Sequence, residues 1–195
     1  MKESLGEKPL SKGEMKNSIR LRSGGYFDFA NPKPDQFTIE DIAGALSKLC
    51  RFGGQSSSFY SVAEHLILCD EIALKMGCDR DCRRAVIMHD AAEAFCGDVV
   101  KPLKIMLESY AKIEQAVEDA VAAAFGIDFA KHKDVIHKID TSIRLSERDQ
   151  LFDPDGVTWS DEAGCERFSV NLNCWNPSRA EYEFLIATGE LGISK

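Results

Sequence analysis

The 195-residue sequence lacks a run of eighteen apolar residues, and it lacks a charged-then-apolar segment at its amino terminus. Both absences predict a cytoplasmic protein with no membrane association. A basic stripe is absent too, because 24 lysine and arginine residues face 32 aspartate and glutamate residues, for a formal net charge of −8. This balance argues against a duplex nucleic-acid partner. It leaves room for a small phosphorylated ligand held by a few local cations.

Internal repeats, low-complexity segments and CxxC pairs are also absent. Seven cysteines, an odd number, are scattered along the chain. Reduced and mostly buried thiols are therefore favoured over a structural zinc site. Hydrophobic residues make up 44% and charged residues 29%, which is ordinary for a globular protein. We expect a poorly ordered tail over residues 1–17 and a single domain over residues 18–195.

The residue pattern predicts a mainly α-helical fold with a small β-hairpin near the amino terminus. Alternating residues Ile19–Arg22 and Tyr26–Phe29 flank a Ser-Gly-Gly turn and form the hairpin. Thr38 with Asp41, and Ser61 with Glu64, have the spacing of capping boxes at helix starts. Apolar residues at helical spacing predict helices over about 39–50, 61–77, 79–95, 101–126, 134–151 and 177–191.

The stretch Met88–Asp98 is the centre of the chemical interpretation. It places His89, Asp90 and Glu93 on one side of the predicted helix, at the edge of an apolar stripe. An imidazole and two carboxylates crowded there repel one another unless a cation or a proton compensates them. This composition is typical of a site for a hard or borderline divalent ion. An isolated His-Asp pair can instead be a capped helix end.

Two further ligand candidates lie on other predicted helices. His65 is in the first turn of the helix that begins at Ser61, and Asp140 faces inward on the helix over 134–151. Ligands from three facing helices of a bundle would form a pocket in the core with room for water. His65 could instead be a satisfied core histidine, and other aspartates share the helix of Asp140. Two more histidines are interpreted as surface or helix-end residues: His132 and His137.

Several segments, in this order along the chain, resemble the motifs of HD-domain metal-dependent phosphohydrolases, in particular the bacterial and phage or prophage 5′-deoxynucleotidase branch. They are Tyr60–His65, Met88–Glu93, and Lys138–Asp140 followed by Glu147–Arg148. The resemblance spans roughly 170 residues, the size of one domain. It implies an HD-domain helical bundle with one divalent metal ion (Mn, Co, Zn, Fe or Mg). Its ligands would be His65, His89, Asp90 and Asp140.

The resemblance also implies roles for residues around that ion. Glu93 matches the catalytic carboxylate, and we count Asp90 with it as catalytic. Asp98 matches an acid that contacts the sugar 3′-hydroxyl, and Arg51 matches an arginine near phosphate and sugar. The stretch in which relatives bring cations near phosphate contains Lys101 and Lys104.

Two of these assignments leave alternatives open. Lys101 and Lys104 could form a solvated helix start, although cations there oppose the helix dipole. The nucleotidase relatives commonly have Arg-Trp where this chain has Arg51-Phe52. This departure puts sugar discrimination in doubt more than hydrolysis. Phe52 could belong to the core or stack on a base.

The sequence therefore predicts an enzyme that hydrolyses deoxyribonucleoside 5′-monophosphates to deoxynucleoside and phosphate with metal-activated water. One alternative is a deoxynucleoside triphosphate triphosphohydrolase with the same site, which would need more cations. Another is a nucleotide-binding HD module without turnover. The expected partners are a small-molecule nucleotide and a second copy of the chain in a homodimer.

Overall fold

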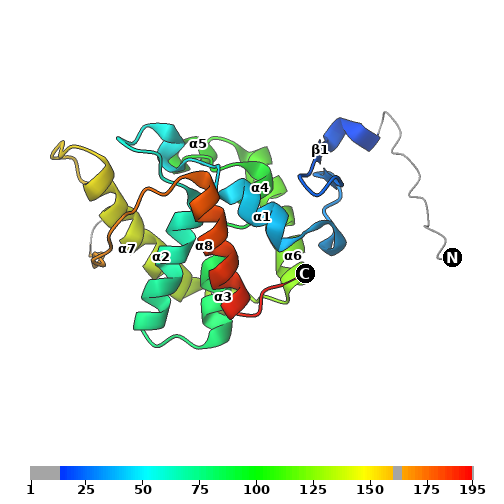
Figure 1. Ribbon diagram of the computed structural model, residues 1–195. Coiled ribbons are helices and arrows are strands. Elements are labelled where there is room, and N and C mark those ends of the chain that lie inside the picture. Colours follow the sequence, from blue (N-terminus) through cyan, green and yellow to red (C-terminus); the bar gives the residue numbers. More distant parts are fainter. Residues whose placement is uncertain (1–13, 160–163, 195) are drawn as a thin grey trace.

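The computed structural model describes residues 14–159 and 164–194 (Figure 1). This part of the chain is mainly helical, with one two-stranded antiparallel sheet near its amino terminus, as the sequence predicts. Residues 1–13 of the predicted tail lie outside the described residues. The remainder of that segment forms a short 3-10 helix, η1 (Glu14–Asn17), directly before the hairpin. None of the described helices is long and apolar enough to cross a membrane.

The predicted hairpin consists of β1 (Ser18–Arg20) and β2 (Tyr26–Asp28). Its strands are shorter than predicted because the chain already turns at Leu21, whose backbone N–H donates to the carbonyl oxygen of Gly25 with an N–O distance of 2.8 Å. Phe27 is fully buried, and its ring centroid lies 4.5 Å from that of Phe95. This aromatic contact holds the hairpin against the helical core.

Several helices begin where the sequence supplies a capping side chain. They are α1 (Ile39–Leu46), α2 (Val62–Lys75), α3 (Arg80–Met88) and α8 (Pro177–Glu190). Their caps are, in the same order, Thr38, Ser61, Asp79 and Asn176. Each cap accepts a backbone N–H that has no partner within its helix.

The capping box predicted at Ser61 is only half formed. Ser61 accepts the N–H of Glu64, but the Glu64 carboxylate accepts three backbone N–H groups of residues 173–175 at 2.7 to 3.1 Å. This fully buried carboxylate therefore ties the segment before α8 to the start of α2.

Three of the other long helices are packed around α2. It contacts α3, α8 and α7 (Lys133–Leu151), and Figure 1 shows α2, α3 and α8 side by side. The helix predicted over residues 134–151 is confirmed as α7, with Ile139, Ile143 and Leu145 fully buried. Three short 3-10 helices connect these elements: η2 (Pro34–Gln36), η3 (Arg51–Gly54) and η4 (Ala130–His132).

The predicted His-Asp helix over about 79–95 is not continuous. α3 ends at Met88, four residues form a turn, and α4 (Glu93–Cys96) follows. The His89 ring nitrogen Nδ1 lies 2.7 Å from the carbonyl oxygen of Val86 and bonds to it. Because a side chain thus takes up a carbonyl of the last turn, the chain can leave the helix at the His-Asp pair.

The predicted helix over 101–126 is also interrupted. α5 (Lys101–Lys104) ends in a turn, and α6 (Glu108–Phe125) begins after it. Ile105 and Met106 in this turn are 74% and 79% exposed, so no core contact holds them in a helix. α6 ends as predicted, at Gly126 in the left-handed conformation (φ 63°), which glycine adopts without steric cost.

Candidate metal centre and adjoining cavity

Two histidines and an aspartate from distant parts of the chain converge. His65 lies in the first turn of α2, His89 caps the end of α3, and Asp140 belongs to α7. One ligand atom of each lies within 4.8 Å of those of the other two, and His65 Nε2 is 3.4 Å from Asp140 Oδ1. Two imidazoles and a carboxylate at these separations could hold a metal ion.

The fourth predicted ligand, Asp90, lies beside this group. Its Oδ2 is 3.3 Å from His89 Nε2 and 3.8 Å from His65 Nε2. Burial raises the pKa of the Asp90 carboxyl, but the adjacent His89 outweighs burial and lowers that pKa to about 2. For Asp140, the two imidazoles likewise outweigh burial and lower the pKa. Both carboxylates are therefore ionised near neutral pH, as metal ligands must be.

His89 is oriented as a metal ligand would be. Its Nδ1 donates to the Val86 carbonyl. Burial lowers the pKa of the ring, but Asp90 and Asp140 outweigh burial and raise it, so the proton that a metal ion would displace is on Nε2. The Nε2 atom is buried and has no hydrogen-bond partner among the described residues, although Asp90 Oδ2 is close. A buried nitrogen left without a partner is costly unless another group binds it. The donor set therefore fits a divalent cation.

His65 is oriented in the same sense by Glu147. The distance from His65 Nδ1 to Glu147 Oε1 is 2.6 Å, so Nδ1 donates and Nε2 faces Asp140. Both side chains are fully buried. A carboxylate behind a histidine selects the tautomer and makes the ring a stronger ligand.

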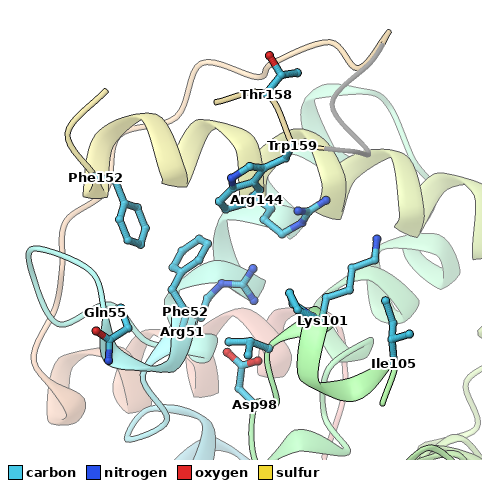
Figure 2. A pocket seen from close by; sticks show the side chains of 12 residues that line it. Arg51, Phe52, Gln55, Asp98, Lys101, Ile105, Arg144, Phe152, Thr158 and Trp159 are labelled. Atoms are coloured by element: carbon cyan, nitrogen blue, oxygen red, sulfur yellow. The ribbon is translucent and has the colours of Figure 1, made fainter. Parts of the chain in front are cut away.

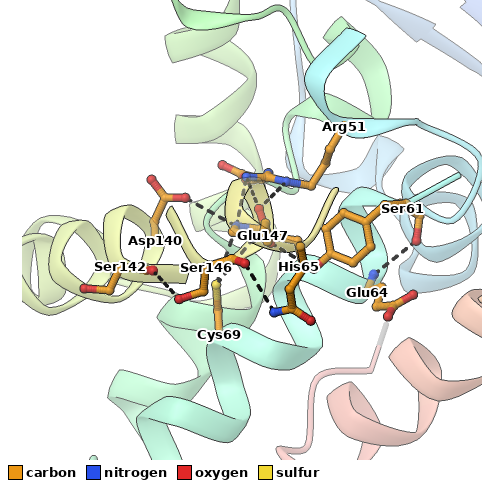
Figure 3. A network of polar contacts seen from close by, with 12 residues as sticks. Arg51, Ser61, Glu64, His65, Cys69, Asp140, Ser142, Ser146 and Glu147 are labelled. Atoms are coloured by element: carbon orange, nitrogen blue, oxygen red, sulfur yellow. Dashed lines mark hydrogen bonds and ion pairs between the residues drawn. The ribbon is translucent and has the colours of Figure 1, made fainter. Parts of the chain in front are cut away.

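Glu147 also connects this group to Arg51 (Figure 3). Its Oε1 accepts the hydroxyl of Tyr60 at 2.8 Å, and its Oε2 lies 3.2 Å from both Nε and Nη2 of Arg51. Burial raises the pKa of the Glu147 carboxyl, but Arg51 and His65 outweigh it and lower that pKa. Sequence reasoning gave Glu147 no role. Its position seven residues after Asp140, on the same face of a helix, was the available signal.

Arg51 and Phe52 are presented by the tight turn of η3. Phe52 has φ 56°, in the left-handed region that a bulky residue rarely adopts, and two glycines with positive φ follow it. Such strain concentrates at functional sites. Arg51 itself is 7% exposed, and its Nη1 lies 3.7 Å from Asp90 Oδ2, so the arginine contacts both the ligand group and Glu147.

A cavity of about 680 Å³ lies beside Arg51 (Figure 2). Through the 3.7 Å contact between Arg51 and Asp90 it is connected to the metal group, defined as His65, His89, Asp90 and Asp140. Four of the residues predicted to bind substrate line the cavity: Arg51, Phe52, Asp98 and Lys101. Lys104, the fifth, is not among the lining residues. Its ammonium group is paired with Glu114 at 2.8 Å on α6, because the short α5 turns it toward that helix.

The opposite wall of the cavity contains residues that sequence reasoning missed. Phe152 packs edge-on against Phe52, with ring centroids 5.3 Å apart. Trp159 lies 6.4 Å from Phe52, and the Arg144 guanidinium lies 5.7 Å from the Trp159 ring. No local pattern marks the two aromatic residues, whereas Arg144 follows Asp140 by one helical turn. Phe52 therefore lies in an aromatic wall and at the cavity surface at once.

Comparison with known proteins assigns the chain to a family through its relatives, whereas no family model matches it. The chain is 33% identical over 141 residues to the uncharacterized protein YfdR of Escherichia coli K12, covering 72% of this chain and 76% of that protein. The chain belongs to the same family as YfdR. An uncharacterized protein of Rhodobacter capsulatus is 33% identical over 140 residues, or 68% of this chain and 71% of its own length.

In this relative of YfdR, a further buried carboxylate, that of Glu93, interacts electrostatically with Asp90 and with Asp98 of the cavity lining. Glu93, the first residue of α4, is 7% exposed, and its Oε2 has no hydrogen-bond partner among the described residues. Burial, together with the charges of Asp90 and Asp98, raises the pKa of the Glu93 carboxyl well above its ordinary value. Burial also raises the pKa of Asp98. A carboxyl with a raised pKa can exchange a proton near neutral pH.

The arrangement around this site combines three capabilities. The imidazoles and ionised carboxylates can hold a divalent cation, the buried Arg51 can neutralise an anionic group, and Glu93 can transfer a proton. Arg51 connects them to a cavity large enough for a small organic ligand, because it lines that cavity and lies 3.7 Å from Asp90.

Proposed function

We propose that the protein is a metal-dependent phosphohydrolase of the HD-domain type that hydrolyses deoxyribonucleoside 5′-monophosphates. The observation that carries this proposal is the buried Nε2 of His89. It has no hydrogen-bond partner among the described residues, and it lies beside Asp90, whose Oδ2 is 3.7 Å from Nη1 of Arg51 in the wall of the cavity. Side chains that can bind a metal ion, next to a cavity with cationic side chains, suit a substrate whose reacting group is a phosphate.

Four side chains would hold the ion: His65, His89, Asp90 and Asp140. Two imidazoles and two carboxylates suit Mn, Co, Zn or Fe, and Mg would bind them less readily because it prefers oxygen ligands. Such an ion, when bound, supplies Lewis-acid polarisation of phosphoryl oxygens and acidifies a water molecule.

The chain's own residues would perform the proton and charge transfers. A water oxygen forms a bond to phosphorus while the bond from phosphorus to the sugar O5′ breaks. Glu93 takes the proton from the attacking water or gives one to the leaving oxygen, so the products are phosphate and a neutral deoxynucleoside. Arg51, held by Glu147, neutralises charge on the phosphoryl oxygens.

The sugar and base would occupy the rest of the cavity. Asp98 in the lining can accept a hydrogen bond from a 3′-hydroxyl, and the aromatic wall of Phe52, Phe152 and Trp159 offers faces on which a base can stack. The expected homodimer stays a prediction, which light scattering would test.

A second candidate is release of triphosphate from deoxynucleoside triphosphates. The observation in its favour is the cation content of the cavity, because Arg144 joins Arg51 and Lys101 in the lining. Product analysis separates the two reactions, since one yields phosphate and the other yields triphosphate. A module without turnover would give neither product.

The test of the metal centre is Asp90→Ala, with Asp134→Ala as its control. Asp90→Ala should lose both bound metal and turnover in a panel of nucleotides and metals, because it removes a carboxylate close to both imidazoles. Asp134, exposed at the start of α7, should tolerate the same change. Stoichiometric metal in Asp90→Ala, measured by elemental analysis, would remove the central claim.

The test of the chemistry is Glu93→Ala. This variant should keep its metal and bind nucleotide, yet lose about 10²–10⁴-fold in kcat, the usual scale of general acid–base catalysis. A wild-type kcat would leave Glu93 with a structural role only.

A further inference from the structure

A second cavity, of about 650 Å³, adjoins the metal group and shares no lining residue with the first. His89 and Asp140 belong to its wall, with residues of α6, of the turn after α6 and of the first half of α7. α7 passes both cavities. Residues 133, 136, 137 and 140 line the second cavity, and Arg144, one turn later, lines the first. The metal group therefore contributes to the wall of the second cavity and lies one helical turn from Arg144 in the wall of the first.

The two cavities carry opposite charge. Among the described residues, the second is lined by four carboxylates, Glu118, Asp119, Asp128 and Asp140, against a single lysine, Lys133. On the same basis, the first contains three cationic side chains and a single carboxylate, Asp98. Burial and the neighbouring carboxylates, Asp119 first among them, raise the pKa of the Glu118 carboxyl. An anion is thus attracted to the first cavity and a cation to the second.

A separate observation connects the acidic cavity to a ligand. His89 belongs to its wall, its side chain is 10% exposed, and its buried Nε2 has no hydrogen-bond partner among the described residues. The exposed His137, interpreted from sequence as a surface residue, also lines this cavity one turn before Asp140. A path of carboxylate and imidazole groups therefore leads to the partnerless nitrogen.

We propose that divalent cations reach the metal group through this acid-lined cavity, steered by Glu118, Asp119 and Asp128, and not through the cavity that receives the nucleotide. The inference rests on the proposed function only in that the group binds a cation. It follows that cation uptake and nucleotide binding use different stretches of α7: residues 133 to 140 line the cation route, and Arg144, one turn later, lines the nucleotide cavity. An anionic substrate in the first cavity therefore leaves the cation route open.

The first test is the rate at which metal-free protein takes up Co²⁺, followed in a stopped-flow instrument by visible absorbance. The triple variant Glu118→Gln, Asp119→Asn, Asp128→Asn keeps the side-chain sizes and an oxygen acceptor for the bonds from Gln115 and from the Lys131 N–H. We expect uptake to slow by about 10-fold or more at low salt, and the difference to shrink at high salt, as electrostatic steering requires. A control with the same charge change uses exposed residues outside both cavities: Glu40→Gln, Glu71→Gln and Glu190→Gln.

The second test blocks each cavity in turn. Ala130→Trp fills the acidic cavity and should slow Co²⁺ uptake, whereas Gln55→Trp fills the other cavity and should leave the uptake rate unchanged. Wild-type uptake rates in the triple variant and in Ala130→Trp, with normal binding at equilibrium, would overturn this inference and leave the proposed function intact. Absence of Co²⁺ binding by the wild type at equilibrium would overturn both.

Discussion

Replacing Glu147 by glutamine tests whether one buried carboxylate holds the two halves of the site together. Glu147 is fully buried and contacts the metal-ligand group through His65 and the substrate cavity through Arg51. Glutamine has nearly the same shape and keeps one oxygen acceptor. It removes the negative charge that faces Arg51, which is itself 7% exposed.

The expected loss of stability follows from the burial of both charges. Removing one partner of a buried ion pair costs about 3–5 kcal/mol, and we expect the lower end because the amide oxygen can still accept a hydrogen bond. For a chain of this size, a loss of about 3 kcal/mol lowers Tm by roughly 6–12 °C. Because Glu147 orients His65, metal affinity should also weaken by about 10–100-fold.

The assay has two readouts. Thermal unfolding followed by circular dichroism gives Tm for the metal-free protein, and titration with Co²⁺ gives the metal Kd. Glu71→Gln is the matched control, because it makes the same chemical change on the exposed side of α2, the helix that carries His65. A Glu147→Gln protein with wild-type Tm and wild-type metal affinity would show that Glu147 holds neither half of the site.

Further predictions concern the sugar and alkaline pH. Because a site whose acid pairs with a substrate hydroxyl rejects substrates that lack this hydroxyl, kcat/KM should fall strongly on 2′,3′-dideoxynucleotides. The variant Asp98→Asn should weaken this preference while sparing metal content. Equal hydrolysis of deoxy and dideoxy substrates by the wild type would rule out the role of Asp98. Burial raises the pKa of Cys82 to about 12 and that of Cys96 to about 11. Between pH 9 and 11 the unfolded chain therefore binds fewer protons than the folded chain, so the free energy of unfolding should fall as pH rises. Urea unfolding measures this free energy, and equal free energies at pH 8 and pH 10.5 would contradict the prediction.

Local signals predicted most of the helices. Thr38, Ser61 and Asn176 cap helices where the sequence places a small polar residue before an apolar run, and Gly126 ends α6. These features depend on residues a few positions apart, so a sequence pattern contains them.

The interruptions depend on contacts that no local pattern contains. α3 ends early because a ring nitrogen of His89 takes the Val86 carbonyl, an alternative that helical periodicity does not distinguish from a continuous helix. The Glu64 carboxylate leaves its capping position for backbone groups more than one hundred residues away. In both cases a side chain forms a hydrogen bond with the backbone in place of the one that the helical pattern predicts.

In the site, too, residue type and spacing were predictable from the sequence, whereas contacts between distant residues were not. His65, His89 and Asp140, each marked by residue type and spacing, converge in a group that could hold a metal ion. Asp90 lies beside them, and its role as a ligand stays a prediction. The pairing of Arg51 with Glu147 across 96 residues was not predictable, nor was the meeting of Phe52 with Phe152 and Trp159. Lys104 was expected near phosphate but turns to Glu114, because α5 is too short to continue into α6.

α7 fixes the positions of the candidate metal ligand Asp140, the cavity residue Arg144 and the buried carboxylate Glu147 relative to one another. Asp140, Arg144 and Glu147 are spaced four and three residues apart, so they follow one face of a single helix at 1.5 Å per residue. Arg144 is thus about 6 Å further along the axis than Asp140, within reach of a group bound beside the metal. Because the helix is packed against both α2 and α3, these distances cannot change independently. The same rigid helix lines the acidic cavity up to Asp140 and the cationic cavity at Arg144, so one element fixes the metal group relative to both cavities.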